Sequence, residues 1–277
     1  MGIFIQTNVA SIEAQKNLNY NQSQLQVSFN RLSSGFRINS AKDDAAGLAI
    51  SESLKSQIRS FAVAERNASD GISMAQTAEG ALNEVHGILG RMRELAVQAA
   101  NGSLTSTDRG FLQTEFSSLQ AEITRIQGSA KFNGRILVGS TPLTITLQVG
   151  LDNTASDQIA VTLGGVSLAT ISSSAGALIS GSTASGALAS LSVIDSAISD
   201  VSTSRSSFGA AMNRLETAQS SISTMRLNLS AANSRIRDVD VATETAVLAR
   251  NQVLSQAGVS VLAQANQLPQ LALNLLG

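Results

Sequence analysis

The chain has 277 residues, of which 43% are hydrophobic, 3% aromatic and 14% charged, with a formal net charge of −1. This balance supplies no field that would attract nucleic acid or an anionic membrane, so we expect neither as a partner. The absence of cysteine excludes disulfides and thiolate chemistry, and the single histidine, His86, cannot build a multi-histidine metal site. No apolar run reaches the about 18 residues of a membrane-spanning helix, and residues 1–10 lack the pattern of a cleavable signal. The composition favours a helical structural or interaction protein without a cofactor.

The first 43 residues carry apolar side chains at helical spacing. This N-terminal column comprises Ile5, Val9, Ile12, Leu18, Leu25, Phe29 and Leu32. Residues 33–40 predict a break after it. Asp43 and Asp44 then favour the start of the next helix, because acidic side chains stabilise a helix N-terminus.

Residues 44–100 are predicted to form one long helix with a heptad stripe. The stripe runs through Leu54, Phe61, Ala68, Ala75, Leu82, Leu89 and Ala96, with Val85, Met92 and Ala99 beside it. An apolar repeat sustained over so many heptads indicates a packed bundle or coiled coil. Asn101-Gly102 ends this helix, and Thr105 or Thr107 caps another over 105–128, which we expect to fold back antiparallel.

The region of about 140–172 is predicted to be a small β-hairpin or meander. Residues 143–149, 159–163 and 166–171 alternate apolar with polar side chains, and Gly164-Gly165 supplies a turn signal between the last two segments. Residues 172–187 are rich in glycine, serine and alanine, so we expect a surface connector there.

Residues 188–235 repeat the pattern of the first long helix. Their stripe comprises Ile194, Val201, Phe208, Leu215, Ile222 and Leu229. Neither long helix can bury its stripe alone, so we expect the two to pack on each other. A weaker break near 237–240 precedes a C-terminal column formed by Val247, Leu254, Val261, Leu262 and Leu268.

These elements predict a mainly α fold, a long antiparallel helical bundle or coiled coil with a small β-hairpin region and paired N- and C-terminal helices. We divide the chain into an inner domain of terminal helices, 1–43 with 236–277, and a core domain, 44–235. The terminal pair is only two helices wide, so it buries too little apolar surface to offset the ordering of its chain. We therefore expect the terminal helices to order on assembly, when neighbouring copies cover their stripes.

No arrangement of residues predicts catalysis. His86 lies near the stripe of a long helix, where a structural histidine is the plainer interpretation. Asp43 and Asp44 are adjacent, so they do not face each other on a helix, and they suit a helix start. We expect the protein not to be an enzyme.

Several long segments resemble bacterial flagellin. The resemblance to the N-terminal part of that family is carried by RLSSGFRINSAKDDAAGLAI at 31–50, RNASDGISMAQTAEGAL at 66–82 and RMRELAVQAANG at 91–102. The C-terminal resemblance is carried by AANSRIRDVDVATE at 231–244 and QAGVSVLAQANQLPQLALNLL at 256–276. Only a short connector stands where many family members carry large variable outer domains, so the chain resembles a minimal flagellin.

The resemblance implies a secreted structural subunit that polymerises into the extracellular flagellar filament for swimming motility. The implied partners are copies of the same chain, the flagellar export apparatus with an export chaperone, and the filament cap and hook-junction proteins. The family's contact with an animal innate immune receptor maps here to Arg91, Leu95 and Glu115. Two alternatives stay open on the sequence alone: a hook–filament junction protein, which shares the terminal helices, and a secreted coiled-coil adhesin.

Overall fold

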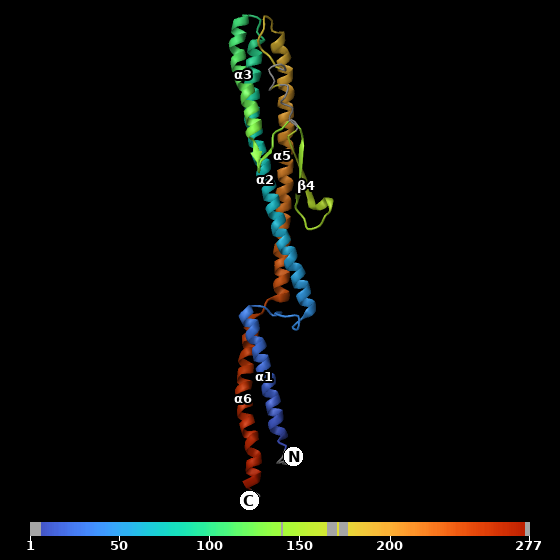
Figure 1. The fold of residues 1–277 in the computed structure, drawn as a ribbon, viewed down its shortest axis with the longest axis vertical. Helices are drawn as coiled ribbons and strands as arrows, with labels where there is room; N and C mark the ends of the chain where they lie inside the picture. The colour runs from blue at the N-terminus through green and yellow to red at the C-terminus, as the bar shows by residue number, and fades with distance from the viewer. Residues whose placement is uncertain (1–6, 140, 165–170, 172–176, 275–277) are drawn as a thin grey trace. The chain divides into compact units, whose positions relative to one another are not determined.

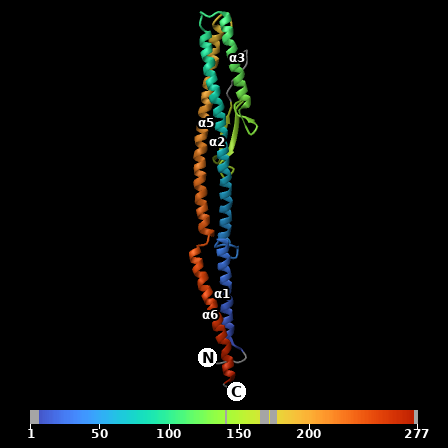
Figure 2. The same cartoon turned by 90° about the vertical axis from the view of Figure 1, so that its left-hand side faces the viewer.

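The structure, a computed structural model, describes residues 7–139, 141–164, 171 and 177–274, with side chains placed up to residue 267 (Figures 1 and 2). The chain separates into two compact units. The first comprises residues 1–58 with 227–277, and the second comprises residues 59–226. The two longest helices, α2 (Ala45–Ala99) and α5 (Ser185–Arg237), contribute residues to both units.

In the second unit, α2 and α5 run antiparallel and bury their heptad stripes. Among the described residues of this unit, three ion pairs join the two helices: Glu65 with Arg226 at 2.9 Å, Glu79 with Arg205 at 3.7 Å, and Arg93 with Asp195 at 2.7 Å. The stripe residues Ala68, Ala75, Leu82, Leu89, Ala96, Ile194, Val201, Phe208 and Leu215 are at most 1% exposed. The packed helical pair predicted from the heptads is confirmed.

Helix α3 (Ser106–Ser129) packs antiparallel to the upper part of α2. Its first turn carries a capping box, in which the Thr105 hydroxyl accepts from the Asp108 amide while the Asp108 carboxylate accepts from the Thr105 amide. Thr105, and not Thr107, is therefore the N-cap. Phe116 and Ile123 face the core with no exposed area, so α3 widens the bundle to three helices.

Two small antiparallel sheets follow α3. β1 (Lys131–Phe132) pairs with β2 (Arg135–Ile136), and β3 (Leu143–Gln148) pairs with β4 (Gln158–Leu163) in a register that sets Leu143 opposite Leu163. A loop that contains the short 3₁₀ helix η1 (Ala155–Asp157) joins β3 to β4. The β1–β2 ribbon was not expected from the sequence.

The predicted turn at Gly164-Gly165 stays a prediction, because Gly165 and the segment after it lie outside the described residues. The described hairpin closes through residues 149–157, and β4 ends at Leu163 immediately before Gly164. Gly164 has φ +74°, and a side chain there would crowd the carbonyl oxygens of Gly139 and Thr141 at 3.0 Å, so this glycine permits a close backbone approach. The third segment expected to alternate lies, apart from Ile171, outside the described residues.

The first unit is built around α1 (Val9–Ser34) and α6 (Val241–Asn274), which lie side by side and antiparallel (Figures 1 and 2). Asn8 caps α1 through its side chain, and Gly35 ends the helix in the left-handed region at φ 74°. Asp240 opens α6 by accepting from the amides of Ala242 and Thr243. The pairing of the terminal helices expected from the sequence is confirmed.

Candidate polymerisation surface

The N-terminal apolar column is only partly covered by α6. Leu18 is 9% exposed and therefore buried, and Leu25 and Leu32 are half-buried. Val9 and Ile12 are each 59% exposed and Phe29 is 50% exposed. Ile5 lies outside the described residues. The column thus has one side against α6 and one side open.

The C-terminal column shows the same division. Val247 and Leu262 are half-buried, whereas Leu254 is 45% exposed and Val261 is 56% exposed. The side chain of Leu268 lies outside the described range. Among the described residues of this pair of helices, four further exposed apolar side chains were not selected by heptad spacing: Tyr20, Val241, Val253 and Val259. A search for all apolar positions off the stripe would have found them.

Polar contacts fix the register of α1 against α6. The Asn8 side-chain amide donates to the Ala265 carbonyl at 2.8 Å, and the Ser11 hydroxyl donates to Asn266 Oδ1 at 2.7 Å. At the other end of α1, Arg31 pairs with Glu244 at 3.5 Å, and Glu244 is only 8% exposed. A buried carboxylate is costly without a partner, so this pair disfavours a shifted register.

The segment that connects α1 to α2 and the segment that connects α5 to α6 are hydrogen-bonded to each other. The Arg37 amide donates to the Arg237 carbonyl at 2.7 Å, and the Val239 amide donates to the Gly35 carbonyl at 3.0 Å. The Arg237 guanidinium lies over the Phe36 ring at 4.6 Å and pairs with Glu52 at 2.6 Å. The breaks predicted near 33–40 and 237–240 are therefore ordered connections.

The three residues carried over for receptor contact lie near one another in the second unit but differ in exposure. Arg91 Nε donates to Glu115 Oε1 at 2.8 Å across α2 and α3, and both side chains are about half exposed. This hydrogen bond, with a second from Arg91 Nη1 to Glu94 Oε2, raises the pKa of Arg91 above its ordinary value. Leu95 is 1% exposed, so it packs beneath this surface.

The remaining polar features do not assemble a reaction centre in the described residues. His86 is half-buried, and its Nδ1 has no hydrogen-bond partner there. Asp43 accepts from the Ser40 amide and hydroxyl, which lowers its pKa, and Asp44 accepts from the Gly47 amide. Across the described ranges, no three histidine, aspartate or glutamate side chains gather as metal ligands.

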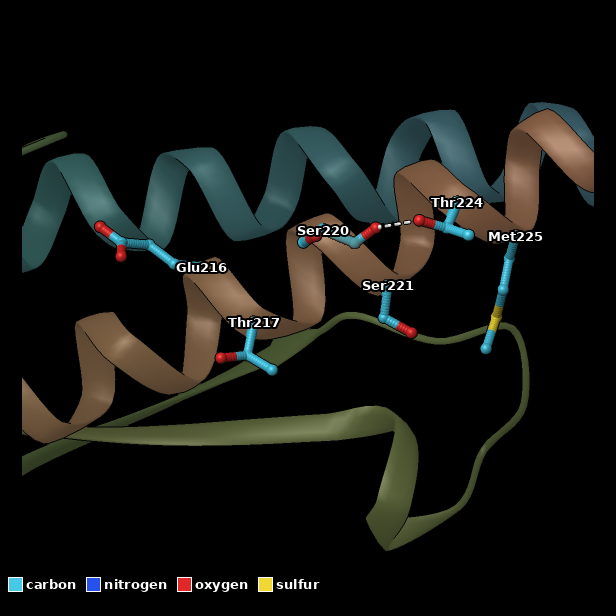
Figure 3. Close-up of a pocket in the computed structure, with 6 residues that line it drawn as sticks. All are labelled: Glu216, Thr217, Ser220, Ser221, Thr224 and Met225. Carbon is cyan, nitrogen blue, oxygen red and sulfur yellow. Dashed lines mark hydrogen bonds between the residues drawn. The ribbon is translucent and has the colours of Figure 1, made fainter.

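The hollow in Figure 3 is a shallow depression on one helix. Its lining residues all belong to α5: Glu216, Thr217, Ser220, Ser221, Thr224 and Met225. Thr224 is occupied in donating to the Ser220 carbonyl at 3.0 Å. A surface formed by one helix face cannot enclose a small molecule. Of the helices in the described ranges, none has the length and hydropathy to cross a bilayer.

Exposed apolar columns on a pair of terminal helices are typical of helical proteins that self-associate. Comparison with known proteins identifies the family within this class. The sequence profile of the bacterial flagellin N-terminal helical region matches residues 5–141, and that of the C-terminal helical region matches residues 191–276.

Individual relatives agree with the profiles. The flagellin of Halalkalibacterium halodurans is 45% identical over 275 residues, which is 99% of this chain and 100% of the relative. The flagellar filament core protein flaB2 of Brachyspira hyodysenteriae is 38% identical over 284 residues, again 99% and 100%. The crystal structure of Bacillus cereus flagellin matches with a TM-score of 0.49 and 30% identity, over 61% of this chain and 94% of that one. The chain belongs to the bacterial flagellin family.

Proposed function

We propose that this flagellin acts as the structural subunit of a flagellar filament and polymerises through the uncovered sides of α1 and α6. The observation that carries the proposal is the exposure of apolar columns on two helices that already face each other. Leu254, Val261 and Phe29 are each 45% exposed or more, although α1 and α6 pack against each other. A pair of helices cannot bury these side chains from both sides. Further copies of the chain can bury the sides that remain exposed.

In this proposal the terminal segments 1–43 and 236–277 form the inner assembly domain, and 44–235 forms the core domain. The terminal segments order when neighbours bury their columns, because a two-helix pair recovers little free energy against the conformational entropy of its residues. The polymerisation residues are Ile5, Val9, Ile12, Leu18, Leu25, Phe29, Leu32, Val247, Leu254, Val261, Leu262 and Leu268. Among the described members, Leu18 is buried, and we expect it to hold the pair together.

The proposal includes the route and the place of assembly. The chain would be secreted through the flagellar export apparatus with an export chaperone, meet the filament cap and hook-junction proteins, and remain extracellular. The absence of cysteine suits export of an unfolded chain, since no disulfide constrains it. No catalytic role is proposed, and neither a hook–filament junction role nor an adhesin role is favoured by an observation.

Recognition by an animal innate immune receptor is proposed at the surface formed by Arg91 and Glu115. Their paired, half-exposed side chains offer both charges to a partner. Leu95 supports that surface from below, because it is buried. Binding of the receptor ectodomain to Arg91→Ala and Arg91→Lys chains, compared by titration, tests this role.

Seeded growth tests the assembly proposal. Purified full-length chain is mixed with short fragments of its own filaments and followed by electron microscopy and sedimentation. We expect elongation by the full chain, and none by chains that lack residues 1–35 or 245–277. Elongation by the shortened chains at the full-length rate would remove α1 and α6 as the assembly element.

A further inference from the structure

The second unit has a hollow of about 280 Å³ between the β3–β4 hairpin and the two long helices. Its apolar lining includes Phe61, Val149, Leu151, Ile222 and Met225. Leu151 is 37% exposed and Met225 is 49% exposed, so the mouth of the hollow is apolar and open. In Figure 3, Met225 points from α5 toward the chain of the hairpin. We name this the hairpin hollow.

The rim of the hairpin hollow is acidic. Asp152 and Asp157 line it, and no lysine or arginine does. Asp152 is exposed and belongs to no ion pair within the described residues. The Asp157 carboxylate accepts from the Thr154 hydroxyl at 2.7 Å and has no other hydrogen bond within the described residues. The hollow thus fits an apolar side chain that carries a cation beside it.

The β1–β2 ribbon of the same unit presents such a pair. Lys131 lies directly opposite Ile136 in the ribbon, so their side chains share one face. Ile136 is 48% exposed, and Lys131 is exposed and without an ion pair in the part of the chain that is described. Asn133 and Gly134 have φ values of 47° and 77°, which match a tight two-residue hairpin turn of fixed shape.

The ribbon cannot fill the hollow of its own chain. In Figures 1 and 2, α3, which ends beside the ribbon, lies higher along the α2–α5 pair than the loop that closes the β3–β4 hairpin. Both belong to the unit of residues 59–226. Two complementary patches at different places on one unit make a head-to-tail contact, which repeats from copy to copy and extends a polymer.

We propose that the Lys131–Ile136 face of the ribbon of one copy docks into the hairpin hollow of a neighbouring copy. This inference rests on the proposed filament function and adds a second, lateral contact to that of the terminal helices. Ile136 covers the apolar mouth at Met225 and Leu151, and the Lys131 ammonium meets the Asp152 carboxylate. The occupant is a second copy of this chain.

Charge reversal and its rescue test the contact. Lys131→Glu and Asp152→Lys chains are each expected to elongate wild-type seeds about tenfold more slowly, through like-charge contact. When the two variants are mixed and alternate along the polymer, each contact joins opposite charges, so we expect elongation to recover. The control is Arg214→Glu. It replaces a cation with an anion, as Lys131→Glu does, at an exposed site on α5 outside both patches. Circular dichroism confirms that each variant folds.

Cross-linking gives a direct readout, because the chain has no cysteine of its own. Filaments made from mixed Ile136→Cys and Met225→Cys chains are treated with a short bis-maleimide and analysed as denatured dimers. We expect dimers from filaments and none from dilute monomers, and none when Leu188→Cys, exposed elsewhere on α5, replaces Met225→Cys. Absence of seeded growth by wild-type chain would remove the filament function itself. Normal filaments without the 136–225 dimer, or a charge mixture that fails to recover, would overturn the docking contact alone.

Discussion

Leu147 of β3 occupies the space above Gly71 of α2, where a methyl group on the helix would overlap Leu147 Cδ1. The same methyl group would approach Leu215 Cδ1 of α5 to 3.2 Å. Because Gly71 has no side chain, the hairpin can pack closely against the two long helices at this position.

Gly71→Ala should lower the thermal midpoint of the chain. Overpacking at a filled site costs about 1–3 kcal/mol, which exceeds the helix propensity gained by alanine. The matched control is Gly80→Ala in the same helix, where nothing lies within 4 Å of the added methyl group. That change should stabilise by about 0.5–1 kcal/mol. Thermal melts followed by circular dichroism compare the two variants. Equal shifts in their thermal midpoints would contradict close packing of the hairpin at Gly71.

Arg109 of α3 is a buried cation that holds the end of α2. It is 2% exposed, and its guanidinium donates to the carbonyls of Ala99 at 2.8 Å and Asn101 at 3.0 Å. Arg109→Lys keeps the charge but loses the fork geometry, so we expect a loss of about 1–3 kcal/mol in the free energy of unfolding.

The control for this change is Arg125→Lys, since Arg125 is exposed and pairs with Glu122 on the same helix. An exposed pair of this kind contributes about 0–1 kcal/mol. Urea titration followed by circular dichroism measures both variants. A loss at Arg125 as large as that at Arg109 would contradict a special role for the buried guanidinium.

The capping box of α3 predicts a pH dependence. Hydrogen bonds from the Thr105 hydroxyl and amide lower the pKa of Asp108 in the folded chain. Between that lowered pKa and the unfolded value of about 3.9, the unfolded state binds more protons. The stabilisation is therefore present above about pH 4 and is lost as the pH falls through the folded pKa.

Thr105→Ala should cost about 1 kcal/mol at neutral pH through loss of the cap, and it should weaken the fall in stability below about pH 4. Thr107→Ala, two residues further along the same turn, is the control because Thr107 is exposed and is not the cap. Thermal midpoints between pH 3 and pH 7 provide the measurement. Identical pH profiles for the Thr105 variant and wild type would contradict the link.

Leu254→Asp should stop seeded elongation while leaving the monomer melt nearly unchanged. The side chain is 45% exposed beside α1, so the charge remains solvated in a monomer but would be buried between copies. Gln252→Asp introduces the same charge at an exposed polar site of α6 and serves as the control. A large drop in the monomer melting temperature of the Leu254 variant would show that its role is intramolecular.

The burial of Leu95 follows from its position on the same face of α2 as two other buried residues. Leu95 is three residues after Met92 and four before Ala99, both of which have no exposed area, so it shares their face of α2. This spacing fits the core face, although the family motif placed Leu95 only with Arg91 at a contact surface. Arg109 had no comparable signal, because its partners are backbone carbonyls brought near only by the fold.

The heptads alone determined the long helices and the stripes through which they pack, because a repeat near 3.5 residues is typical of packed helices. Local polar residues determined the caps at Asn8, Asp240 and Thr105. The tertiary structure decided that 143–148 pairs with 158–163, since alternation by itself suits more than one partner. It also decided which members of the terminal columns are covered, because a second helix hides one side of a column and leaves the other to solvent.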